Sequence, residues 1–252
     1  MDLGTPLGKP MGAALGGAGG SGSGGFIGAA VAPPRYETAP ATGLVGSAVT
    51  GLWMACLFTV NSQAVASSNK TPAAAFGTGG WRLVTTTTNA AVVFNCITGV
   101  SPTYTFVAND IGKLFLAVGL IDVVGAIARL YVNGAQVGAG TVVATYTPLT
   151  AGAGTTLGGT SAGNAASGLS VFGLCGGPTI PSDAEILQLF TDVKASRRIV
   201  EIPGKTANLW SVPPAPVAVP ETIRDTVGGV NMSRLGTLGA LVPTISRAPF
   251  SY

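Results

Sequence analysis

The stretch that decides the fold is Arg129-Leu130-Tyr131-Val132-Asn133-Gly134-Ala135-Gln136-Val137. Asn133-Gly134 is a dipeptide favoured in two-residue type I′ turns, because both central residues of that turn need a positive φ. A turn there pairs Val132 with Ala135 on one face of a hairpin and leaves Tyr131 and Gln136 on the other. A slip of one residue would turn the apolar face towards water. The stretch therefore predicts a hairpin in a half-buried antiparallel sheet.

Further strand-like runs, rich in Val, Thr and aromatic residues, alternate with Gly, Asn and Ser turns on both sides of this hairpin. Short strands of this kind are typical of a β-sandwich or barrel. We expect strands at residues 52–60, 81–86, 91–97, 103–107, 113–121, 127–132, 135–145, 155–158 and 169–174.

One helix is expected near the carboxyl side of the chain. Ser182 as N-cap and Glu185 at the third helical position form a capping box. Apolar residues then recur at i, i+3, i+4 and i+7, the spacing of a single buried stripe: Ile186, Leu189, Phe190 and Val193. The helix should end near residues 194–196. Arg197 and Arg198 follow, where cations suit the helix dipole, and we interpret them as a solvated helix end.

The chain is unusually poor in charge. Charged residues make up 9% of its 252 residues, whereas apolar residues make up 47% and 38 residues are glycine. An average soluble domain carries about 25% charged residues, and a monomer with so few charges is poorly protected against association. We therefore expect partners to cover much of the surface, in a homo-oligomer (a trimer is one option) or a larger assembly.

Several function classes are disfavoured by the composition. The net charge of +3 is scattered, without the basic cluster that a nucleic-acid partner would need. The absence of histidine removes the commonest general base and metal ligand. The most apolar run, residues 114–121, is far shorter than the roughly 20 residues of a membrane span, and no targeting segment is visible. We expect synthesis in a cytoplasm and no membrane partner.

The three cysteines, Cys56, Cys96 and Cys175, are far apart and lack paired metal-ligand spacing. We expect buried free thiols that pack as small hydrophobic side chains. A disulfide between two of them is the alternative.

We divide the chain into a Gly-rich N-terminal arm (1–40), a sandwich domain (41–202) and a Pro-rich extended C-terminal tail (203–252). The arm cannot bury enough side chain to order itself, so it is either a flexible linker or, as we favour, a segment ordered against neighbouring subunits. The residues expected to make such assembly contacts are Phe26, Ile27, Trp210, Phe250 and Tyr252.

The order of these signals resembles the laminin-G-like, concanavalin A-like jelly roll. The resemblance covers about residues 44–200 and is carried by Leu130-Tyr131-Val132-Asn133-Gly134, Leu157-Gly158-Gly159, the strand at 169–174 and the helix start Ser182–Ile186. It implies an all-β, antiparallel jelly-roll sandwich with one short helix and extended N- and C-terminal arms. The arm, Leu209-Trp210 and the tail are also similar to tailed-phage virion proteins that contain this domain.

Two activities of the family are not expected here. Calcium needs several oxygen ligands on one ion, and the candidates Asp110, Asp122 and Asn133 are isolated in sequence. Retaining glycosidases need two carboxyl groups about 5 Å apart, and no acid pair lies on one strand; Asp183 and Glu185 are accounted for by helix capping. We therefore expect no catalytic, cofactor-binding or metal-binding residue.

The aromatic residues Trp53, Trp81, Trp210, Tyr104, Tyr131 and Tyr146 have two interpretations. They are core or interface anchors, which we favour, or they form a sugar-stacking platform. Tyr131, with Gln136 beside it on the face opposite the apolar one, is the best candidate for a carbohydrate contact.

These observations lead to a main hypothesis and an alternative. The main one is a non-enzymatic structural protein of a tailed-phage particle, such as a head decoration, fibre, neck or tail component, which contacts itself and other virion proteins through its arms. The alternative is a lectin-like, carbohydrate-binding module that recognises host-surface glycans. A hydrolase ranks lowest.

Overall fold

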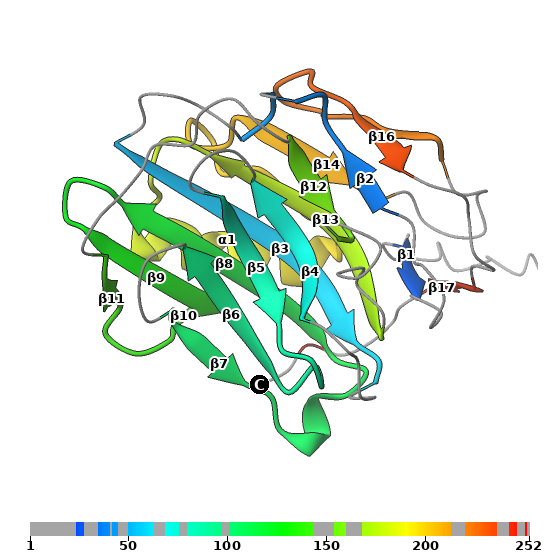
Figure 1. The fold of residues 1–252 in the computed structure, drawn as a ribbon, viewed down its shortest axis with the longest axis horizontal. Helices are drawn as coiled ribbons and strands as arrows, with labels where there is room; N and C mark the ends of the chain where they lie inside the picture. Colours follow the sequence, from blue (N-terminus) through cyan, green and yellow to red (C-terminus); the bar gives the residue numbers. More distant parts are fainter. Residues whose placement is uncertain are drawn as a thin grey trace, which may run out of the picture.

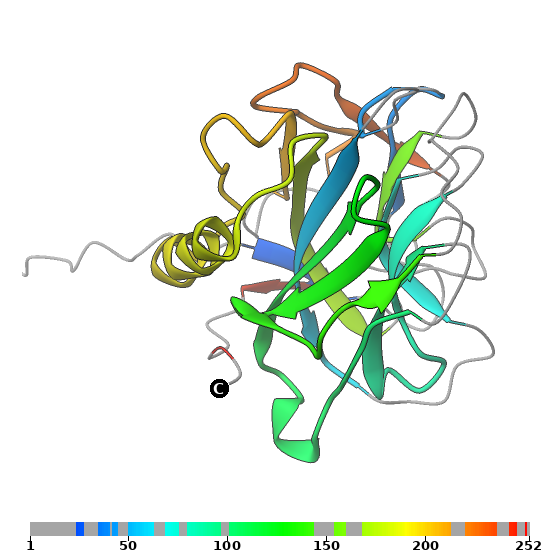
Figure 2. The ribbon, with the colours of Figure 1, turned by 90° about the vertical axis from the view of Figure 1, so that its left-hand side faces the viewer.

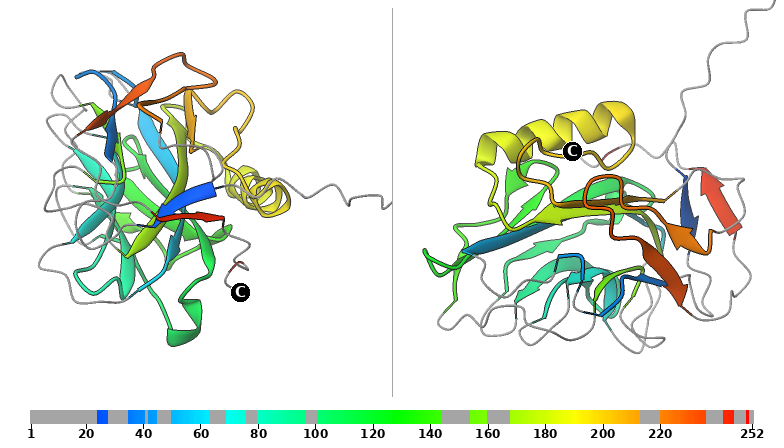
Figure 3. Two further views of the ribbon diagram at one scale, coloured as in Figure 1. Left: turned by 90° about the vertical axis from the view of Figure 1, so that its right-hand side faces the viewer. Right: turned by 90° about the horizontal axis from the view of Figure 1, so that it is seen from above.

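The computed structural model describes residues 24–27, 35–40, 42–44, 50–62, 69–75, 80–96, 101–143, 154–159, 168–212, 220–235, 242–245 and 250. They form two antiparallel sheets, A and B, packed face to face, with one α-helix on the outer face of sheet A. Figure 1 looks onto sheet B. Figure 2 and the right-hand view of Figure 3 show helix α1, sheet A and sheet B following one another as three layers. This confirms the predicted all-β jelly-roll sandwich.

Sheet A contains, in spatial order, β10 (Ala135–Gln136), β9 (Ile127–Val132), β8 (Leu114–Asp122), β3 (Gly51–Val60), β13 (Leu169–Gly177), β1 (Gly24–Ile27) and β17 (Val242–Ile245), with β11 (Thr141–Val142) also paired to β9 and β14 (Asn208–Ser211) also paired to β13. Sheet B contains β15 (Thr222–Ile223), β16 (Met232–Leu235), β2 (Arg35–Glu37), β12 (Thr155–Leu157), β4 (Lys70–Ala75), β5 (Trp81–Thr85), β6 (Ala91–Cys96) and β7 (Thr103–Thr105). The 3-10 turn η1 (Ala108–Asp110) leads into β8, and helix α1 is Asp183–Ser196.

The deciding hairpin forms in the predicted register. Val132 lies opposite Ala135, and Tyr131 lies opposite Gln136. Asn133 and Gly134 both have positive φ, at 52° and 82°, as a type I′ turn requires. The prediction is confirmed at the level of the backbone.

Two apolar clusters hold the three layers together. Alternate residues of β3 belong to different clusters. Met54, Cys56 and Phe58 face sheet B, whereas Trp53, Ala55 and Leu57 face helix α1. Sheet A is thus covered on both faces. A strand buried on both faces reads as a continuous apolar run, which explains the unbroken sequence of β3.

A β-bulge in β13 changes which residues of this strand face sheet B and which face helix α1. The pairing of β13 with β3 shifts between Val171 and Gly173. Val171 before the bulge and Leu174 after it both face sheet B, although three positions separate them. One extra residue, Phe172, resets the alternation and packs on the helix side of the sheet.

Helix α1 begins and ends as predicted. The Ser182 hydroxyl accepts a bond from the Glu185 N–H, and the Glu185 carboxylate accepts one from the Ser182 N–H at 2.7 Å. Ile186, Leu189 and Val193 are buried against sheet A. Arg197, with a left-handed φ of 59°, ends the helix.

Other predicted strands agree with the structure to within a few residues, with one exception. The strand expected at 135–145 is broken into β10 and β11, because Gly138 and Gly140 between them have positive φ of 66° and 87°. Strand β4 was not predicted, since its sequence Lys-Thr-Pro-Ala-Ala-Ala carries a proline and a run of alanines. Its register shifts between Lys70 and Ala73, where the proline lies.

The described parts of the predicted arm and tail belong to the sandwich itself. Strand β1 pairs with β13 and β17, and β2 lies between β12 and β16 in sheet B. Strands β14 to β17 likewise pair with other strands of the two sheets. The prediction of extended arms is therefore corrected for these residues, because their backbone hydrogen bonds are made within this chain; residues 1–23 lie outside the described part.

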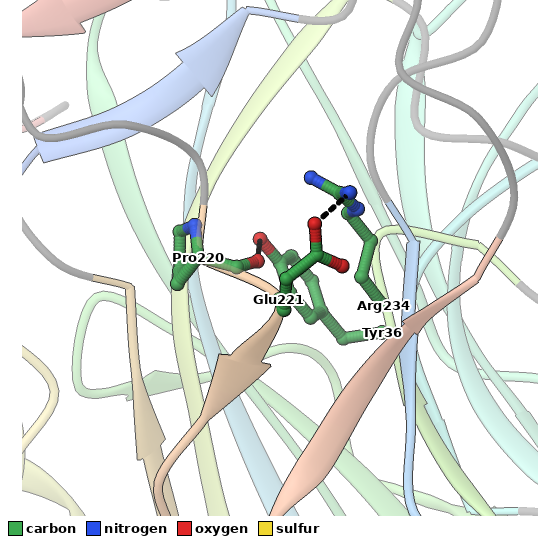
Figure 4. Close-up of polar contacts among 4 residues, drawn as sticks. All are labelled: Tyr36, Pro220, Glu221 and Arg234. Carbon is green, nitrogen blue, oxygen red and sulfur yellow. Dashed lines mark hydrogen bonds and ion pairs between the residues drawn. The ribbon is translucent and has the colours of Figure 1, made fainter.

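Side chains also fasten the tail onto β2, as Figure 4 shows. The Tyr36 hydroxyl donates to the Pro220 carbonyl at 3.0 Å. Arg234 of β16 forms an ion pair with Glu221, and its backbone N–H donates to the Glu221 carbonyl. Burial raises the pKa of Tyr36, so the hydroxyl keeps the proton that this bond needs.

Candidate functional site

Tyr131, the predicted sugar contact, is not on an open surface. Its side chain is 1% exposed and packs with the cluster between sheet A and helix α1. Its hydroxyl oxygen lies 2.7 Å from Asp183 Oδ1 and 3.2 Å from Gln136 Oε1. The predicted role is wrong for Tyr131, because the first turn of the helix covers the face that the hairpin pattern left open. Gln136 is exposed, and its amide donates to the Gly138 carbonyl.

The bond from Tyr131 to Asp183 ties the helix to the hairpin. Burial, followed by the hydrogen bond and the charge of Asp183, raises the pKa of Tyr131. The hydroxyl therefore remains a donor across the physiological range. The hairpin thus positions the helix rather than a ligand.

We expect Tyr131→Phe to lower the free energy of unfolding by about 1 kcal/mol, because it removes one side-chain hydrogen bond and leaves the ring in place. Urea unfolding measures this change. Gln136→Ala is the control and should change stability by less than about 0.5 kcal/mol, since that side chain is exposed. Equal stability of Tyr131→Phe and the parent would contradict the assignment.

The other aromatic candidates are core residues too, as favoured. Trp53, Trp81 and Trp210 are each at most 1% exposed, and Tyr104 is half-buried against the core. The Trp210 indole donates to the Val230 carbonyl at 2.7 Å. Tyr146 lies outside the described residues. The described aromatic candidates therefore offer no open sugar-stacking platform.

The residues expected to make assembly contacts have internal partners where the structure describes them. Trp210 is fully buried on β14, so its predicted role is wrong. Phe250 is buried against Phe190 and lies under Arg197, whose guanidinium carbon is 5.0 Å from the ring centre, so it too fastens the tail within the chain. Phe26 and Ile27 pair through their backbones with β13 and β17. Tyr252 lies outside the described residues.

A polar row that was not predicted crosses the outer face of sheet B. On each strand it alternates with residues that face the core, such as Tyr36, Leu83 and Phe94. Its members lie directly opposite one another on six neighbouring strands, from β16 to β6: Ser233, Glu37, Thr156, Ala74, Arg82 and Asn95. Because side chains alternate between faces, the row points away from the core. Ala74 and Thr156 at its centre are nevertheless buried, whereas Ser233, Glu37, Arg82 and Asn95 keep some exposure. We call it the sheet B row.

The sheet B row offers both hydrogen-bond donors and acceptors. Arg82 and Asn95 are half-buried, and neither has a hydrogen-bond or ion-pair partner among the described residues. Glu37 is half-buried and accepts a bond from the Gly154 N–H at 3.3 Å. Guanidinium, amide, carboxylate and hydroxyl groups together can match the mixed donor and acceptor pattern of a polyhydroxylated ligand.

Thr156, at the centre of the row, is an exception to the rule that buried polar groups are paired. Its side chain is 2% exposed, and its hydroxyl is the only buried side-chain polar atom without a partner within the described part of the chain. Leaving a buried hydroxyl unpaired costs about 1–3 kcal/mol. Such a group calls for an explanation, and a bound water or ligand is one.

The two described cysteine thiols are inaccessible. Cys56 and Cys175 are free and buried, as predicted, and they face opposite sides of sheet A. Burial raises the pKa of both thiols, so neither supplies a thiolate. The side chain of Cys96 lies outside the described part.

The calcium candidates are engaged by backbone groups: Asp110 and Asp122 close local turns, and Asn133 ties the hairpin turn to β8. Asp110, Asp122 and Asn133 accept bonds from the backbone N–H groups of Val107, Gly125 and Leu116, each at 2.9 Å. Within the described ranges, no group of three or more Cys, Asp and Glu residues is placed to hold a metal ion. In the same ranges no helix is both long and apolar enough to cross a membrane.

No family model and no curated protein matches the chain, but solved structures do. One is a protein from Bacteroides ovatus that is provisionally named as carbohydrate-binding. The match covers 90% of this chain and 60% of that protein, at 14% identity and a TM-score of 0.61. The chain has a concanavalin A-like jelly-roll fold. A second match, to the binding domain of botulinum neurotoxin serotype G, covers 60% of this chain and 38% of that one (11% identity, TM-score 0.49). A third, to Trypanosoma rangeli sialidase in complex with sialic acid, covers 67% of this chain and 27% of that one (17% identity, TM-score 0.46).

The likeness to the Bacteroides ovatus protein shows the fold. The chain spans 60% of the length of that protein. The expected place in a phage particle stays a prediction.

The sheet B row was missed for a physical reason. Arg82 and Asn95 do alternate with apolar neighbours in β5 and β6, which is a detectable signal. The row becomes visible only when β4, β12 and β2 are paired in turn beside β5. Those pairings join residues far apart in the chain.

Proposed function

We propose that the protein is a non-enzymatic carbohydrate-binding module that uses the outer face of sheet B. The observation that supports this most is the sheet B row, in which Arg82 and Asn95 are half-buried, adjacent and without partners among the described residues. Ligand sites use a few convergent polar groups to fix orientation. The resemblance in fold to a protein provisionally named as carbohydrate-binding is in keeping with this choice.

Hydrolysis is disfavoured by the absence of histidine and by the engagement of the acids and thiols described above. The chain has no histidine, and Glu185 is occupied by the capping box, as Asp183 is by Tyr131. A serine or cysteine nucleophile needs a neighbouring base or a lowered pKa, whereas burial raises the pKa of Cys56 and Cys175. Binding without turnover is the function that these side chains fit.

A viral structural protein, made in the host cytoplasm and located in the virion, is the second candidate. It is favoured by the 9% of charged residues, a composition that suits a surface covered by copies of itself or by other virion proteins. The internal pairing of the described arm and tail residues weakens it. Glycan recognition on a host surface would be compatible with either setting.

A glycan array with the purified chain tests the proposal. We expect specific binding to at least one glycan, weakened by about tenfold or more in Arg82→Ala/Asn95→Ala, since each lost hydrogen bond to a charged or polar group is worth about a factor of ten. Arg198→Ala is the matched control: this arginine is exposed at the end of helix α1, on the opposite layer, and its loss should leave binding unchanged. A chain that binds no glycan but forms a stable oligomer favours the second candidate.

A further inference from the structure

We infer that the sheet B row prefers a saccharide carrying an anionic oxygen group, a carboxylate or a sulfate, which Arg82 binds; this rests on the function proposed above. Arg82 lies on β5 between Ala74 of β4 and Asn95 of β6. A planar guanidinium matches the geometry of such a group through two parallel N–H···O bonds. The neighbours of Arg82 in the row determine whether its guanidinium is available to a ligand.

No acidic side chain in the row neutralises Arg82. The nearest carboxylate along the row is Glu37, on β2, three strands away. Neighbouring strands lie about 4.8 Å apart, so roughly 14 Å separate the two backbone positions. Glu37 already accepts the Gly154 N–H, and Arg82 has no ion-pair partner among the described residues. Within the described part of the chain, no acidic group therefore compensates the positive charge of the guanidinium.

Burial makes that charge more effective. Arg82 is half-buried, and two charges attract more strongly near a low-dielectric surface than in open water. Ala74 beside it carries only a methyl group and does not compete for the guanidinium. Asn95, on the other side and also half-buried, has both a donor and an acceptor for a neighbouring hydroxyl. Arginine thus selects the acidic group, and asparagine selects the ring that carries it.

The unpaired Thr156 hydroxyl does not belong to the saccharide site. It lies two strands from Arg82, about 10 Å along the row, and it is buried without a partner among the described residues. Thr156 is 2% exposed and Ala74, between it and Arg82, is 0% exposed, so an enclosed water rather than a saccharide would satisfy this hydroxyl. We therefore expect the saccharide to contact Arg82 and Asn95, which are half-buried, and not Thr156.

Calorimetric titration with four probes tests this inference: trigalacturonate, its methyl ester, a sulfated galactose trisaccharide and its unsulfated parent. We expect at least one acidic probe to bind about tenfold or more tightly than its neutral counterpart, as expected for charge-assisted bonds. Whichever pair shows the preference identifies carboxylate or sulfate as the recognised group. Raising the salt concentration should weaken the binding of the acidic probe and leave the binding of the neutral probe unchanged.

Substitutions at Arg82 and Thr156 test this inference separately from the proposed function. Arg82→Gln should lower the affinity for the acidic probe to about that for its neutral counterpart, whereas Arg82→Lys should keep part of the preference for the acidic probe, because the charge remains and the two parallel N–H···O bonds are lost. Thr156→Val is the control: it should keep or raise the melting temperature, since it removes an unpaired buried hydroxyl, and it should leave the preference for the acidic probe unchanged, since Thr156 is only 2% exposed. Equal affinity for acidic and neutral probes, or an unchanged preference in Arg82→Gln, overturns the inference but not the proposed function. Failure of every probe and every array glycan overturns both.

Discussion

Replacing Asp225 with alanine is expected to lower the free energy of unfolding by about 3–5 kcal/mol, as expected when a buried charged group that holds several donors is removed. Asp225 is 7% exposed and accepts five hydrogen bonds of 2.6–3.1 Å. The donors are the Asn208 amide and the backbone N–H groups of Leu209, Val227, Gly228 and Val230. Alanine would leave these donors without their acceptor.

The same carboxylate joins the tail to sheet A. Leu209 and Asn208 belong to β14, which pairs with β13, whereas Val227, Gly228 and Val230 lie in the loop before β16 of sheet B. Asp225→Asn should cost less, about 2 kcal/mol, because it keeps the shape but turns a donor towards other donors. Asp122→Ala is the matched control, since Asp122 accepts a single bond from Gly125, and should cost about 1 kcal/mol or less.

Asp225 also gives stability a dependence on pH. Burial by itself would raise the pKa of Asp225, but the bonds from Asn208, Leu209, Gly228 and Val227 outweigh it and hold this pKa below its usual value. A depressed pKa contributes stability that is fully present above the unfolded value of about 3.9 and is lost as the pH falls through the folded value. Urea unfolding at pH 7 and pH 3 should therefore show a smaller gap between the parent and Asp225→Asn at the lower pH. A gap that does not change with pH would contradict this account.

Gly119→Ala is expected to cost about 3 kcal/mol, at the upper end for an overpacked core. Gly119 lies in β8, and a Cβ there would be 2.1 Å from Phe94 Cδ2 and 2.5 Å from Phe94 Cε2. Phe94 belongs to β6 of sheet B and is fully buried. One methyl group would therefore push the two sheets apart or force the ring out of its rotamer.

A double-mutant cycle makes this prediction specific. Phe94→Leu removes the ring atoms that a Cβ would meet, so Gly119→Ala should cost at least about 1 kcal/mol less in that background. Gly112→Ala is the control: its Cβ would meet nothing within 4 Å, and its φ of 79° should cost only about 1 kcal/mol. Additive effects in the cycle would show that Phe94 is not what excludes a side chain at Gly119.

The requirement for glycine at position 119 shows what could not be predicted from the sequence. Nothing in the run Leu116-Ala117-Val118-Gly119-Leu120 indicates that one residue must lack a side chain. That requirement comes from a ring on the other sheet, 25 residues away in the chain. Sequence patterns record which face is apolar, but they do not record how deeply an opposing side chain reaches into it.

The sequence by itself determined the elements whose cause is local. Asn133-Gly134 set the hairpin because only its own φ values had to be positive, and Ser182 with Glu185 set the helix start because both partners lie within one turn. The continuous apolar runs of β3 and β8 likewise marked the centre of the sandwich. These features needed no knowledge of distant residues.

Only the tertiary structure decided which surfaces stay open. Helix α1 covers Tyr131, so the side chain that the hairpin pattern turned outward became a buried hydrogen-bond donor. Trp210 and Phe250 became internal anchors because the tail returns to the two sheets. Arg82, Asn95 and Thr156 became one row because strands distant in the chain pair side by side. Local backbone preferences act between neighbours in sequence, whereas burial and side-chain proximity depend on which elements pack together.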